Sequence, residues 1–407
     1  MRLLCLQQSS IFETYGGIEY YLHDLLTLAS ESLGPHSVTS LIPQRNEVLQ
    51  EIETSYSVIP VKKRSTGLFQ KIENRFSPFL FSAALSAAKQ SKAEVILAGH
   101  VSLAPMAMAL SKTLGIPFWT VAYGLEVWGG LKIQDGWALR KSQKIISISH
   151  WTKSILEARG FSKHKIEVVH PGLPRHFESV ATRKAPLDSS LPLKLLTVSR
   201  LDSREQYKGH DHLIQALGII KVKRPDALPF YTIQGRGDDK ARLERLVFYG
   251  GLQERVTFID KLESREELVS LYQGHDVFVM PSRFGCWDGK WRGEGFGIVY
   301  VEAGACGLPS VAYDCGGATD IIRNGENGLL IKPDNVEGLA EALITLHDNR
   351  EMIHRLGEKA RESSFEKFSF ASIKKELNQA LGLSQSITEV RPSSNSIDIS
   401  NVTNVLS

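Results

Sequence analysis

The chain has 407 residues, of which 42% are hydrophobic and 23% charged; this is a globular composition in a chain too long for one hydrophobic core, so two domains are expected. Its net charge is only +3 and its cations form short clusters, which argues against a nucleic-acid partner. Four cysteines without zinc-site spacing, and the lack of an apolar run of membrane-spanning length, favour a reduced, cytoplasmic protein.

Apolar strands alternate with amphipathic helical patterns through the first half of the chain. Helices are expected at residues 18–33 and 104–114. Strands are expected at residues 3–6, 38–42, 95–98, 118–122, 145–148 and 166–169. Short, nearly continuous apolar strands that alternate with helices predict a parallel sheet covered on both faces.

The same alternation returns in the second half. Helices are expected at residues 212–222 and 339–347. Strands are expected at residues 193–198, 230–234, 256–259, 277–280, 310–313 and 328–331. Two successive sets of this kind predict an α/β protein with two doubly wound domains.

Composition marks the ends of these domains. The stretch 175–192 is polar, carries two prolines and lacks periodicity, so the domains are placed at 1–180 and 190–365. Residues 384–407 are rich in Ser and Asn and poor in aromatic residues, which predicts a disordered tail.

Open parallel sheets bind ligands at the carboxyl ends of their strands, so the strand-to-helix loops are the candidate sites. The first of these loops ends in Gly16 and Gly17, just before a predicted helix. Glycine there lets the backbone approach a ligand, and the helix N-terminus offers free amides to an anion. A tight turn explains the pair equally well.

Two cations flank the next candidate loop, in VSRLDSREQYKGHDHLIQAL at residues 198–217. Arg200 stands at a strand end and Lys208 just before a predicted helix. A guanidinium fork and a point charge at the carboxyl end of a strand suit a diphosphate. The alternative is a pair of solvated surface cations, which the flanking strand and helix disfavour.

The segment IQGRGDD at residues 233–239 has only part of a nucleotide-binding pattern. It lacks the third glycine and the later acidic residue of the dinucleotide fingerprint. Gly235 and Arg236 are expected to shape a nucleoside pocket, with Arg236 near the base. A plain turn is an equal alternative.

The most informative stretch is GEGFGIVYVEAGACG at residues 293–307. A glycine-rich loop leads into a predicted helix at 298–305, whose first amides face an anionic ligand. These amides belong to Phe296, Gly297 and Ile298.

Two carboxylates stand in that stretch, Glu294 in the loop and Glu302 in the helix. Eight residues of helix cover about 12 Å, near the span from a hexose across a diphosphate to a ribose. Glu294 is therefore expected to accept hydrogen bonds from sugar hydroxyls and Glu302 from ribose hydroxyls. The alternative for Glu302, a helix-surface carboxylate, is disfavoured by its apolar neighbours.

No D-x-D occurs in the sequence, so no metal site and no metal bridge to a diphosphate are expected. Arg200 and Lys208 would then stabilise the leaving diphosphate, with help from helix amides.

These motifs together resemble the GT-B glycosyltransferases, specifically family 4 (group 1) of the retaining, nucleotide-sugar-dependent enzymes. The resemblance runs from Met1 to about Leu383, and its most specific element is E-x7-E, Glu294 to Glu302. The Arg200 and Lys208 pair supports it. So do Gly16-Gly17, VVHPGL at 168–173 and FIDKLESREELVSLYQGHDVFVMPSR at 258–283.

The resemblance implies a fold and a reaction. Two Rossmann-like domains would face a cleft, the first binding the acceptor and the second the donor. Residues 366–383, with a helix at 370–381, would cross back to the first domain. A hexosyl group would pass from a UDP- or GDP-sugar to a sugar, polysaccharide or lipid-linked acceptor. Retention of configuration is expected, without metal or any cofactor beyond the nucleotide sugar.

The resemblance also assigns roles to residues. Arg200 and Lys208 would hold the diphosphate, Glu294 the donor sugar and Glu302 the ribose. The other donor-binding residues would be Gly16, Gly17, Gly235, Arg236, Lys261, Phe296, Gly297 and Ile298.

The chain departs from the family pattern in the loop AYGLEVW, residues 122–128, where relatives often carry an acceptor-side His. Tyr123 stands in that place and Glu126 follows. Tyr is a poorer base at neutral pH, so the polar role passes to Glu126 or to the donor phosphate. Tyr123 and Glu126 are kept as catalytic candidates. His100, at another strand end, is a further candidate, although a lone His is more often structural.

A second departure is the extra loop CWDGKWR at residues 286–292. Its two Trp rings would stack on a sugar, and Lys290 and Arg292 would meet an anionic acceptor. A surface lid without substrate contact is an equal alternative.

The first domain holds a basic and aromatic segment. Lys62, Lys63 and Arg64 precede GLFQKIENRFSPFLF, a composition suited to peripheral contact at the inner face of a membrane. A helix packed on the domain is the alternative.

Two other functions stay open at this point. One is a nucleotide-sugar 2-epimerase on the same architecture, and the other is a non-catalytic nucleotide-sugar-binding relative. The presence of Glu294, Arg200, Lys208 and Glu302 argues against a decayed site.

Overall fold

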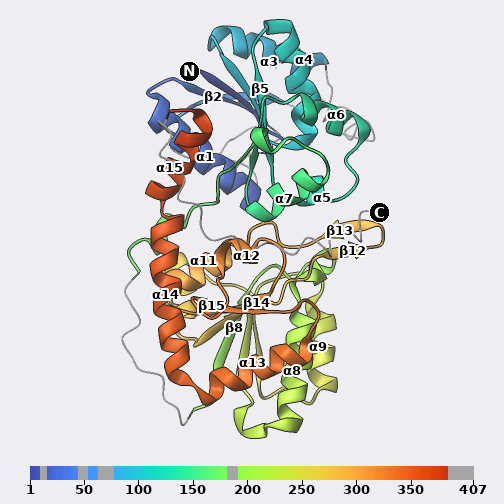
Figure 1. Ribbon diagram of the computed structural model, residues 1–407, viewed down its shortest axis with the longest axis vertical. Helices are drawn as coiled ribbons and strands as arrows, with labels where there is room; N and C mark the ends of the chain where they lie inside the picture. The colour runs from blue at the N-terminus through green and yellow to red at the C-terminus, as the bar shows by residue number, and fades with distance from the viewer. Residues whose placement is uncertain (10–15, 45–53, 63–77, 181–190, 384–407) are drawn as a thin grey trace. The chain divides into compact units, whose positions relative to one another are not determined.

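The computed structural model describes residues 1–9, 16–44, 54–62, 78–180 and 191–383 (Figure 1). It divides into two compact units. Unit 1 comprises Met1–His170 and the chain from Ile373 onward, and unit 2 comprises Pro171–Ser372. Each unit is described by itself.

Unit 1 is built on a parallel seven-stranded sheet in the order β3-β2-β1-β4-β5-β6-β7. Its strands are β1 (Leu3–Leu6), β2 (Val38–Gln44), β3 (Ser57–Lys62), β4 (Val95–Ala98), β5 (Phe118–Ala122), β6 (Lys144–Ser147) and β7 (Ile166–Val168). The order reverses direction between β1 and β4, where Leu3 pairs with both Val38 and Val95.

Helices cover the faces of this sheet because its strands are apolar on both sides. They are α1 (Gly17–Leu33), α3 (Pro78–Gln90), α4 (Ala104–Leu114), α5 (Leu125–Trp128), α6 (Ile133–Lys141), α7 (His150–Ala158) and α15 (Phe370–Leu381), with short 3-10 turns η1 (Val101–Leu103) and η2 (Lys163–Lys165). On one face, buried Leu4, Leu6 and Ile96 pack against residues of α3 and α4.

The last helix, α15, belongs with unit 1. The Lys144 ammonium donates to the Ala380 carbonyl, and Lys374 pairs with Glu31 at 3.0 Å. Buried Ile373 and Leu377 lie on its inner face. A hydrophobic stripe and two polar contacts therefore hold the end of the described chain on the first sheet.

Unit 2 repeats the plan with a parallel six-stranded sheet in the order β10-β9-β8-β11-β14-β15. Its strands are β8 (Lys194–Val198), β9 (Phe230–Gln234), β10 (Val256–Ile259), β11 (Val277–Val279), β14 (Ser310–Tyr313) and β15 (Gly328–Ile331). Its order reverses between β8 and β11.

The helices of unit 2 lie on both sides of that sheet (Figure 1). They are α8 (His210–Lys223), α9 (Lys240–Tyr249), α10 (Arg265–Gln273), α11 (Ile298–Ala305), α12 (Ala318–Ile321), α13 (Val336–Asp348) and α14 (Arg350–Phe368), with 3-10 turns η3 (Arg175–Phe177), η4 (Ser203–Lys208) and η5 (Pro225–Ala227). The core between strands and helices includes Leu195, Ile233 and Leu217, all fully buried.

The prediction of two doubly wound α/β domains is confirmed by the two parallel sheets. Two parts of the sheet structure differ from the sequence prediction. β3 contains Pro60, which removes a backbone donor and is tolerated because β3 is an edge strand. The extra loop at 286–292 forms an antiparallel hairpin of β12 (Gly285–Trp287) and β13 (Lys290–Arg292). Its turn, Asp288-Gly289, has positive φ values of 51° and 69°, as a tight hairpin requires.

Some of the predicted features lie outside the described residues. These are the tail at 384–407, residues 181–190 of the proposed domain boundary, and the membrane-contact segment from Lys63 to residue 77. In the described part of the chain, no helix is both long enough and apolar enough to cross a membrane.

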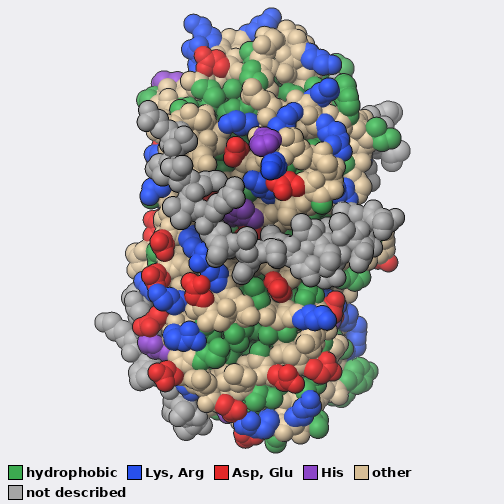
Figure 2. All heavy atoms as spheres, in the orientation of Figure 1, with side chains coloured by type: hydrophobic (Ala, Val, Ile, Leu, Met, Phe, Trp, Pro, Cys, Tyr) green, Lys and Arg blue, Asp and Glu red, His purple; other side chains and the backbone are tan. Residues whose placement is uncertain are grey.

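Surface charge does not separate by sign over unit 2. Figure 2 shows Lys and Arg side chains interspersed with Asp and Glu side chains on its drawn face. Ion pairs of unit 2 include Arg224 with Asp348 at 3.0 Å and Lys240 with Asp260 at 2.6 Å. The drawn face of unit 2 thus has no broad basic stripe of the kind that binds nucleic acid.

Candidate functional site

The candidate site of unit 2 lies where the strand order reverses. β8 and β11 are neighbours there, and the loops that follow them carry Ser199–Lys208 and the chain from Met280 to Gly297. In open α/β sheets this position binds ligands. The fold therefore brings two of the predicted motifs to one edge of the sheet.

The two predicted cations meet at a shared carboxylate. The Arg200 guanidinium pairs with one oxygen of Glu205, and Lys208 Nζ lies 3.3 Å from the other. The Lys208 side chain is only 13% exposed, whereas Arg200 is 73% exposed. Lys208 is thus held in place by its surroundings, and Arg200 is accessible to a ligand. Glu205 was not predicted; its i,i+3 spacing to Lys208 within η4 is the signal that could have indicated the contact.

Glu294 lies in the electrostatic neighbourhood of both cations. Burial raises the pKa of its carboxyl group, Lys208 and Arg200 oppose this, and Glu205 adds to it. The Phe296 backbone N–H donates a hydrogen bond to the carboxylate. Burial, and then the charge of Glu294, raise the pKa of Tyr207. The structure therefore gathers Arg200, Lys208 and Glu294 into one cluster, and their binding roles stay predictions.

The loop before α11 depends on glycine. Gly297 has φ 91° and ψ 59°, and a Cβ there would overlap the Tyr300 ring. The Gly317 N–H donates to the Glu294 carbonyl at 2.8 Å, and a Cβ on Gly317 would overlap the Phe296 backbone. The Gly316-Gly317 pair after β14, which was not predicted, therefore supports the segment that carries Glu294 and the first amides of α11.

Glu302 is buried on α11, with 8% of its surface exposed. The Tyr272 hydroxyl donates a 2.8 Å hydrogen bond to its Oε2. Burial raises the pKa of Glu302 to about 7, and the hydrogen bond from Tyr272 opposes the rise. The surface-carboxylate alternative is therefore wrong. Tyr272 was not predicted because it lies thirty residues away in sequence.

Gly235 supports the loop that carries Arg200. It has φ 152°, and a Cβ there would overlap the Ser199 carbonyl oxygen. The Leu201 N–H donates to the Arg236 carbonyl at 2.7 Å, so the two loops run against each other. The Arg236 Nε donates to the Asp260 carbonyl at 2.9 Å.

We expect Gly235→Ala to destabilise unit 2, because the added methyl group would push Ser199 and Arg200 away from the second loop. The unfolding temperature and the affinity for a nucleoside diphosphate should both fall. Gly218→Ala is the matched control, since Gly218 lies in α8 and no atom lies within 4 Å of the position that its new methyl group would take. That change should stabilise the protein by about 0.5–1 kcal/mol. Equal effects of the two substitutions in thermal unfolding would contradict the role given to Gly235.

Lys261 is another donor-binding candidate of unit 2, next to Asp260, whose carbonyl accepts from Arg236. It follows the edge strand β10, is exposed, and pairs with Glu263 at 2.5 Å. β10 is two strands from β8, roughly 10 Å away at the spacing of a sheet. Contact with the diphosphate is therefore not favoured.

A buried histidine fixes the strand end beneath Arg200. His210 Nε2 lies 2.8 Å from Ser199 Oγ, and its Nδ1 lies 3.1 Å from Tyr231 Oη. Burial and then Lys208 lower the pKa of His210 to about 4, so the ring is neutral at physiological pH. The network joins β8, β9 and the start of α8.

Arg283 joins the loop after β11 to η4. Its guanidinium donates to the Gln206 carbonyl at 2.6 Å and to both carboxylate oxygens of Asp211 at 3.2 and 3.3 Å. Its backbone N–H donates to the Tyr207 carbonyl at 2.6 Å. These bonds hold the segment that ends in Lys208.

The hairpin β12–β13 is attached to the same region. Trp287 lies under the Arg283 guanidinium at 5.7 Å, and the Trp291 ring lies 5.1 Å from Phe284. The Arg292 guanidinium donates to the Arg204 carbonyl. Both Trp rings thus have partners within unit 2, while Lys290 is exposed.

In unit 1, Gly16 caps α1 in an extended conformation, with φ −146° and ψ 163°. Gly17 begins the helix, and no atom lies within 4 Å of the position of a Cβ on it. The segment before them, 10–15, lies outside the described residues. The two glycines therefore stand at the start of a helix, and neither has the positive φ that favours glycine.

Tyr123 does not have the surroundings of a catalytic base. Its hydroxyl donates to the Gly99 carbonyl at 2.9 Å, and burial, followed by Tyr21, raises its pKa. Its backbone N–H donates to the Glu126 carboxylate, which is thereby engaged as a cap. His100 stacks on the Tyr123 ring at 6.0 Å. These contacts disfavour Tyr123 as a proton acceptor, in line with the weak basicity expected from the sequence: the aromatic ring fills the core, and a catalytic role for Tyr123 and Glu126 stays a prediction.

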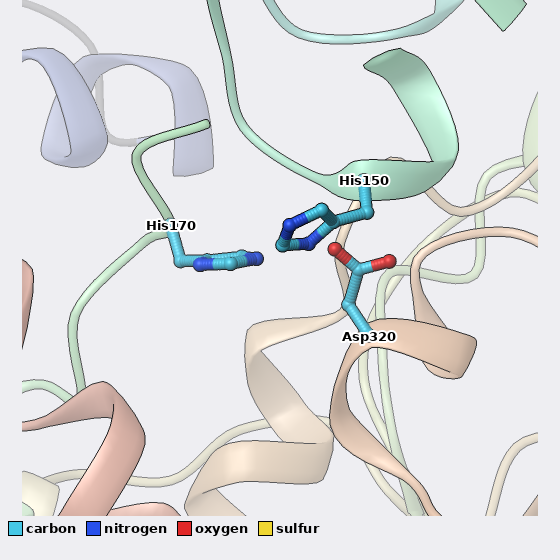
Figure 3. A group of neighbouring side chains, drawn as sticks. All are labelled: His150, His170 and Asp320. Carbon is cyan, nitrogen blue, oxygen red and sulfur yellow. The ribbon is translucent and has the colours of Figure 1, made fainter. Parts of the chain in front are cut away.

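The segment VVHPGL contains a histidine that is held by α15. The His170 backbone N–H and Nδ1 contact the two carboxylate oxygens of Glu376 at 2.8 and 2.9 Å. The His150 ring lies 5.1 Å from the His170 ring, as Figure 3 shows. Figure 3 also draws Asp320, which belongs to α12 of unit 2, and we assign no site to residues of different units.

Two family models match the chain, one for each sheet. A model described as Glycosyltransferase Family 4 matches residues 15–176, and one described as Glycosyl transferases group 1 matches residues 182–363. Together they cover most of the chain.

Two relatives from Corynebacterium glutamicum are similar over part of their length. A D-inositol 3-phosphate glycosyltransferase is 29% identical over 222 residues, 53% of this chain and 50% of the relative. A GDP-mannose-dependent monoacylated alpha-(1-6)-phosphatidylinositol monomannoside mannosyltransferase is 36% identical over 142 residues, 35% of each chain. The matches thus span half or less of these relatives.

One solved structure matches nearly throughout. The crystal structure of HepE from Anabaena in complex with UDP-glucose aligns with a TM-score of 0.68 over 94% of this chain and 99% of that one. At 19% identity the likeness establishes a shared fold.

Proposed function

Since the chain belongs to the group 1 glycosyltransferases and has their GT-B fold, we propose that it transfers a hexosyl group from a nucleoside-diphosphate sugar to an acceptor hydroxyl. The observation that carries the proposal is the cluster at the β8–β11 edge. Two cations interact with the half-buried Glu294, which stands just before the N-terminus of α11, and Glu302 lies further along the same helix.

The donor is a UDP- or GDP-sugar in this proposal. One relative is named as GDP-mannose-dependent, and one structural neighbour was solved with UDP-glucose. Arg200 and Lys208 hold the diphosphate, Glu294 the hexose hydroxyls, and Glu302 the ribose. The amides of Phe296, Gly297 and Ile298 complete the part of the donor site that lies in unit 2, and a donor contact by Gly16 and Gly17 of unit 1 stays a prediction.

The reaction breaks the bond between the anomeric carbon and the diphosphate oxygen and forms one to the acceptor oxygen. Negative charge develops on the leaving diphosphate, where Arg200 and Lys208 stabilise it without a metal. Because Tyr123 is disfavoured as a base, the acceptor proton passes to the departing phosphate oxygen. We propose retention of configuration, in line with the family resemblance, and name no protein nucleophile.

The acceptor is a sugar, a polysaccharide or a lipid-linked saccharide. Relatives whose names specify phosphatidylinositol or inositol phosphate support an acceptor of this range. Peripheral contact at the inner face of a membrane stays a prediction, because most of its segment, residues 63–77, lies outside the described residues.

A donor screen tests the function. UDP-, GDP- and ADP-sugars are added to the full chain, and the unfolding temperature is measured, because a ligand that binds the folded state raises it. We expect one nucleotide class to raise it and the matching sugar to be consumed only with an acceptor present. Formation of an epimerised nucleotide sugar without free nucleotide would instead identify an epimerase. Binding without turnover on any acceptor would identify a non-catalytic relative.

A further inference from the structure

We propose that Tyr272 is a positioning residue for the ribose side of the donor site: it holds the Glu302 carboxylate in place and in its ionised form, ready to accept the hydroxyl pair of a ribose. The inference rests on the proposed function, because it takes Glu302 as the ribose-binding group. It adds a residue that touches no substrate and acts through another side chain.

The geometry fixes the Tyr272 ring firmly. The side chain is fully buried on α10, with Phe177 at 5.8 Å edge-on and Phe278 at 6.0 Å. Its hydroxyl therefore has one direction, toward Glu302 Oε2 at 2.8 Å. α11 is held in turn by α14, where the Ser364 hydroxyl donates to the Val301 carbonyl at 3.1 Å.

Other titratable and charged groups around Glu302 do not replace this contact. Burial and then Glu302 raise the pKa of Cys306 to about 12, so the thiol stays neutral. The Arg361 guanidinium on α14 donates to the Ala305 and Val180 carbonyls. Burial lowers the pKa of His176, which stands beside Phe177. Among the described residues, Tyr272 thus donates the hydrogen bond that the Glu302 carboxylate accepts.

The chemistry requires the ionised form of Glu302. A carboxylate accepts hydrogen bonds through both oxygens, whereas a protonated carboxyl group has lost part of that capacity. Burial disfavours the charged form of the carboxyl group, and a hydrogen bond from a hydroxyl donor favours that form. With one oxygen bonded to Tyr272, the other is left to accept from the ribose diol.

The sign of the pH dependence follows. The pKa of Glu302 in the folded protein is about 7, above its ordinary value, so the ionised fraction and the affinity for ribose rise with pH through that region. Removing the Tyr272 hydroxyl deletes the hydrogen bond that lowers this pKa. The midpoint of the affinity profile should then move to higher pH.

The test compares UDP and GDP with their 2′-deoxy forms by calorimetry, between about pH 6 and pH 9. The ratio of the two affinities isolates the ribose contact, because phosphate titration is common to both ligands. We expect Tyr272→Phe to lower the ribonucleotide preference about tenfold near pH 7 and to shift its midpoint upward. Glu302→Gln should flatten the pH profile.

Tyr56→Phe is the matched control, since Tyr56 is also buried and bonded to a side chain, His23 at 2.9 Å, but lies in unit 1. It should leave the affinity ratio unchanged. An unchanged ratio in Tyr272→Phe, or a loss equal at every pH with the midpoint unmoved, would overturn the inference. If the unaltered protein binds neither nucleotide, the proposed function itself fails. If the affinity ratio of Glu302→Gln does not change with pH and the midpoint of Tyr272→Phe does not shift, only the positioning role of Tyr272 is contradicted.

Discussion

Replacing Lys208 with alanine should lower the turnover number about a hundredfold to a thousandfold, the usual effect of deleting a fixed charge that faces developing negative charge. Lys208 is nearly buried and paired with Glu205, so its ammonium is held in position before the donor arrives. It also lowers the pKa of Glu294. Its loss therefore removes a stabilising charge and leaves Glu205 and Glu294 with Arg200 alone of the two paired cations. The measurement is the initial rate at saturating nucleotide sugar.

Lys223→Ala is the matched control for this change, because Lys223 is an exposed cation in the last turn of α8. Its turnover should equal that of the unaltered protein. Circular dichroism and thermal unfolding of both variants establish that the fold is kept. A Lys208→Ala variant that turns over at close to the normal rate would remove Lys208 from the diphosphate site.

Replacing Glu294 with glutamine should also lower the turnover number by about two orders of magnitude or more. Glutamine keeps the size and an oxygen that accepts from the Phe296 N–H, so the loop before α11 is preserved. It loses the charge that binds the hydroxyls of the donor sugar. Because burial and Glu205 oppose ionisation of Glu294, the unfolding temperature should not fall in the variant.

Glu341→Gln provides the comparison, since Glu341 is exposed on α13 and remote in sequence from the cluster. Both variants are assayed with the same donor and acceptor, and free nucleotide release is measured alongside transfer. Full transfer activity in Glu294→Gln would show that the hexose is held by another group.

The order of elements could be predicted because the strands are short apolar runs and the helices are amphipathic. Strand β1 and helix α15 could be predicted from local sequence alone. The apolar run of β1 and the amphipathic spacing of α15 each lie within one short segment. β3 could not be predicted in this way because Pro60 interrupts its short apolar run, which Ser57 and Lys62 bound. The hairpin β12–β13 was predicted only as a loop, although Asp-Gly is a strong turn signal.

The candidate site was predictable where chemistry lies within one motif. Arg200, Lys208 and Glu294 each stand in a loop that follows a strand or precedes a helix, and Glu302 follows Glu294 in the same motif, so sequence order alone could group them. Glu205 and Tyr272 could not be found in this way, because their importance comes from contacts in three dimensions.

Tyr123 is a residue whose surroundings the sequence did not reveal. Its place in the loop after β5 suggested a catalytic role, but its aromatic ring is large and apolar enough to fill the core beside Tyr21 and His100. Burial of this kind depends on neighbours that are distant in sequence, such as Tyr21 and His100, and a local sequence pattern does not contain them. Fewer residues are therefore proposed for the acceptor side of the reaction than for the donor side.

The most direct measurement of the central claim is a crystal structure of the full chain with the nucleoside-diphosphate sugar selected in the donor screen. The account predicts that the diphosphate contacts Arg200, Lys208 and the first amides of α11, with the hexose at Glu294 and the ribose at Glu302. A diphosphate bound away from both cations, or a ribose with no contact to Glu302, would contradict it.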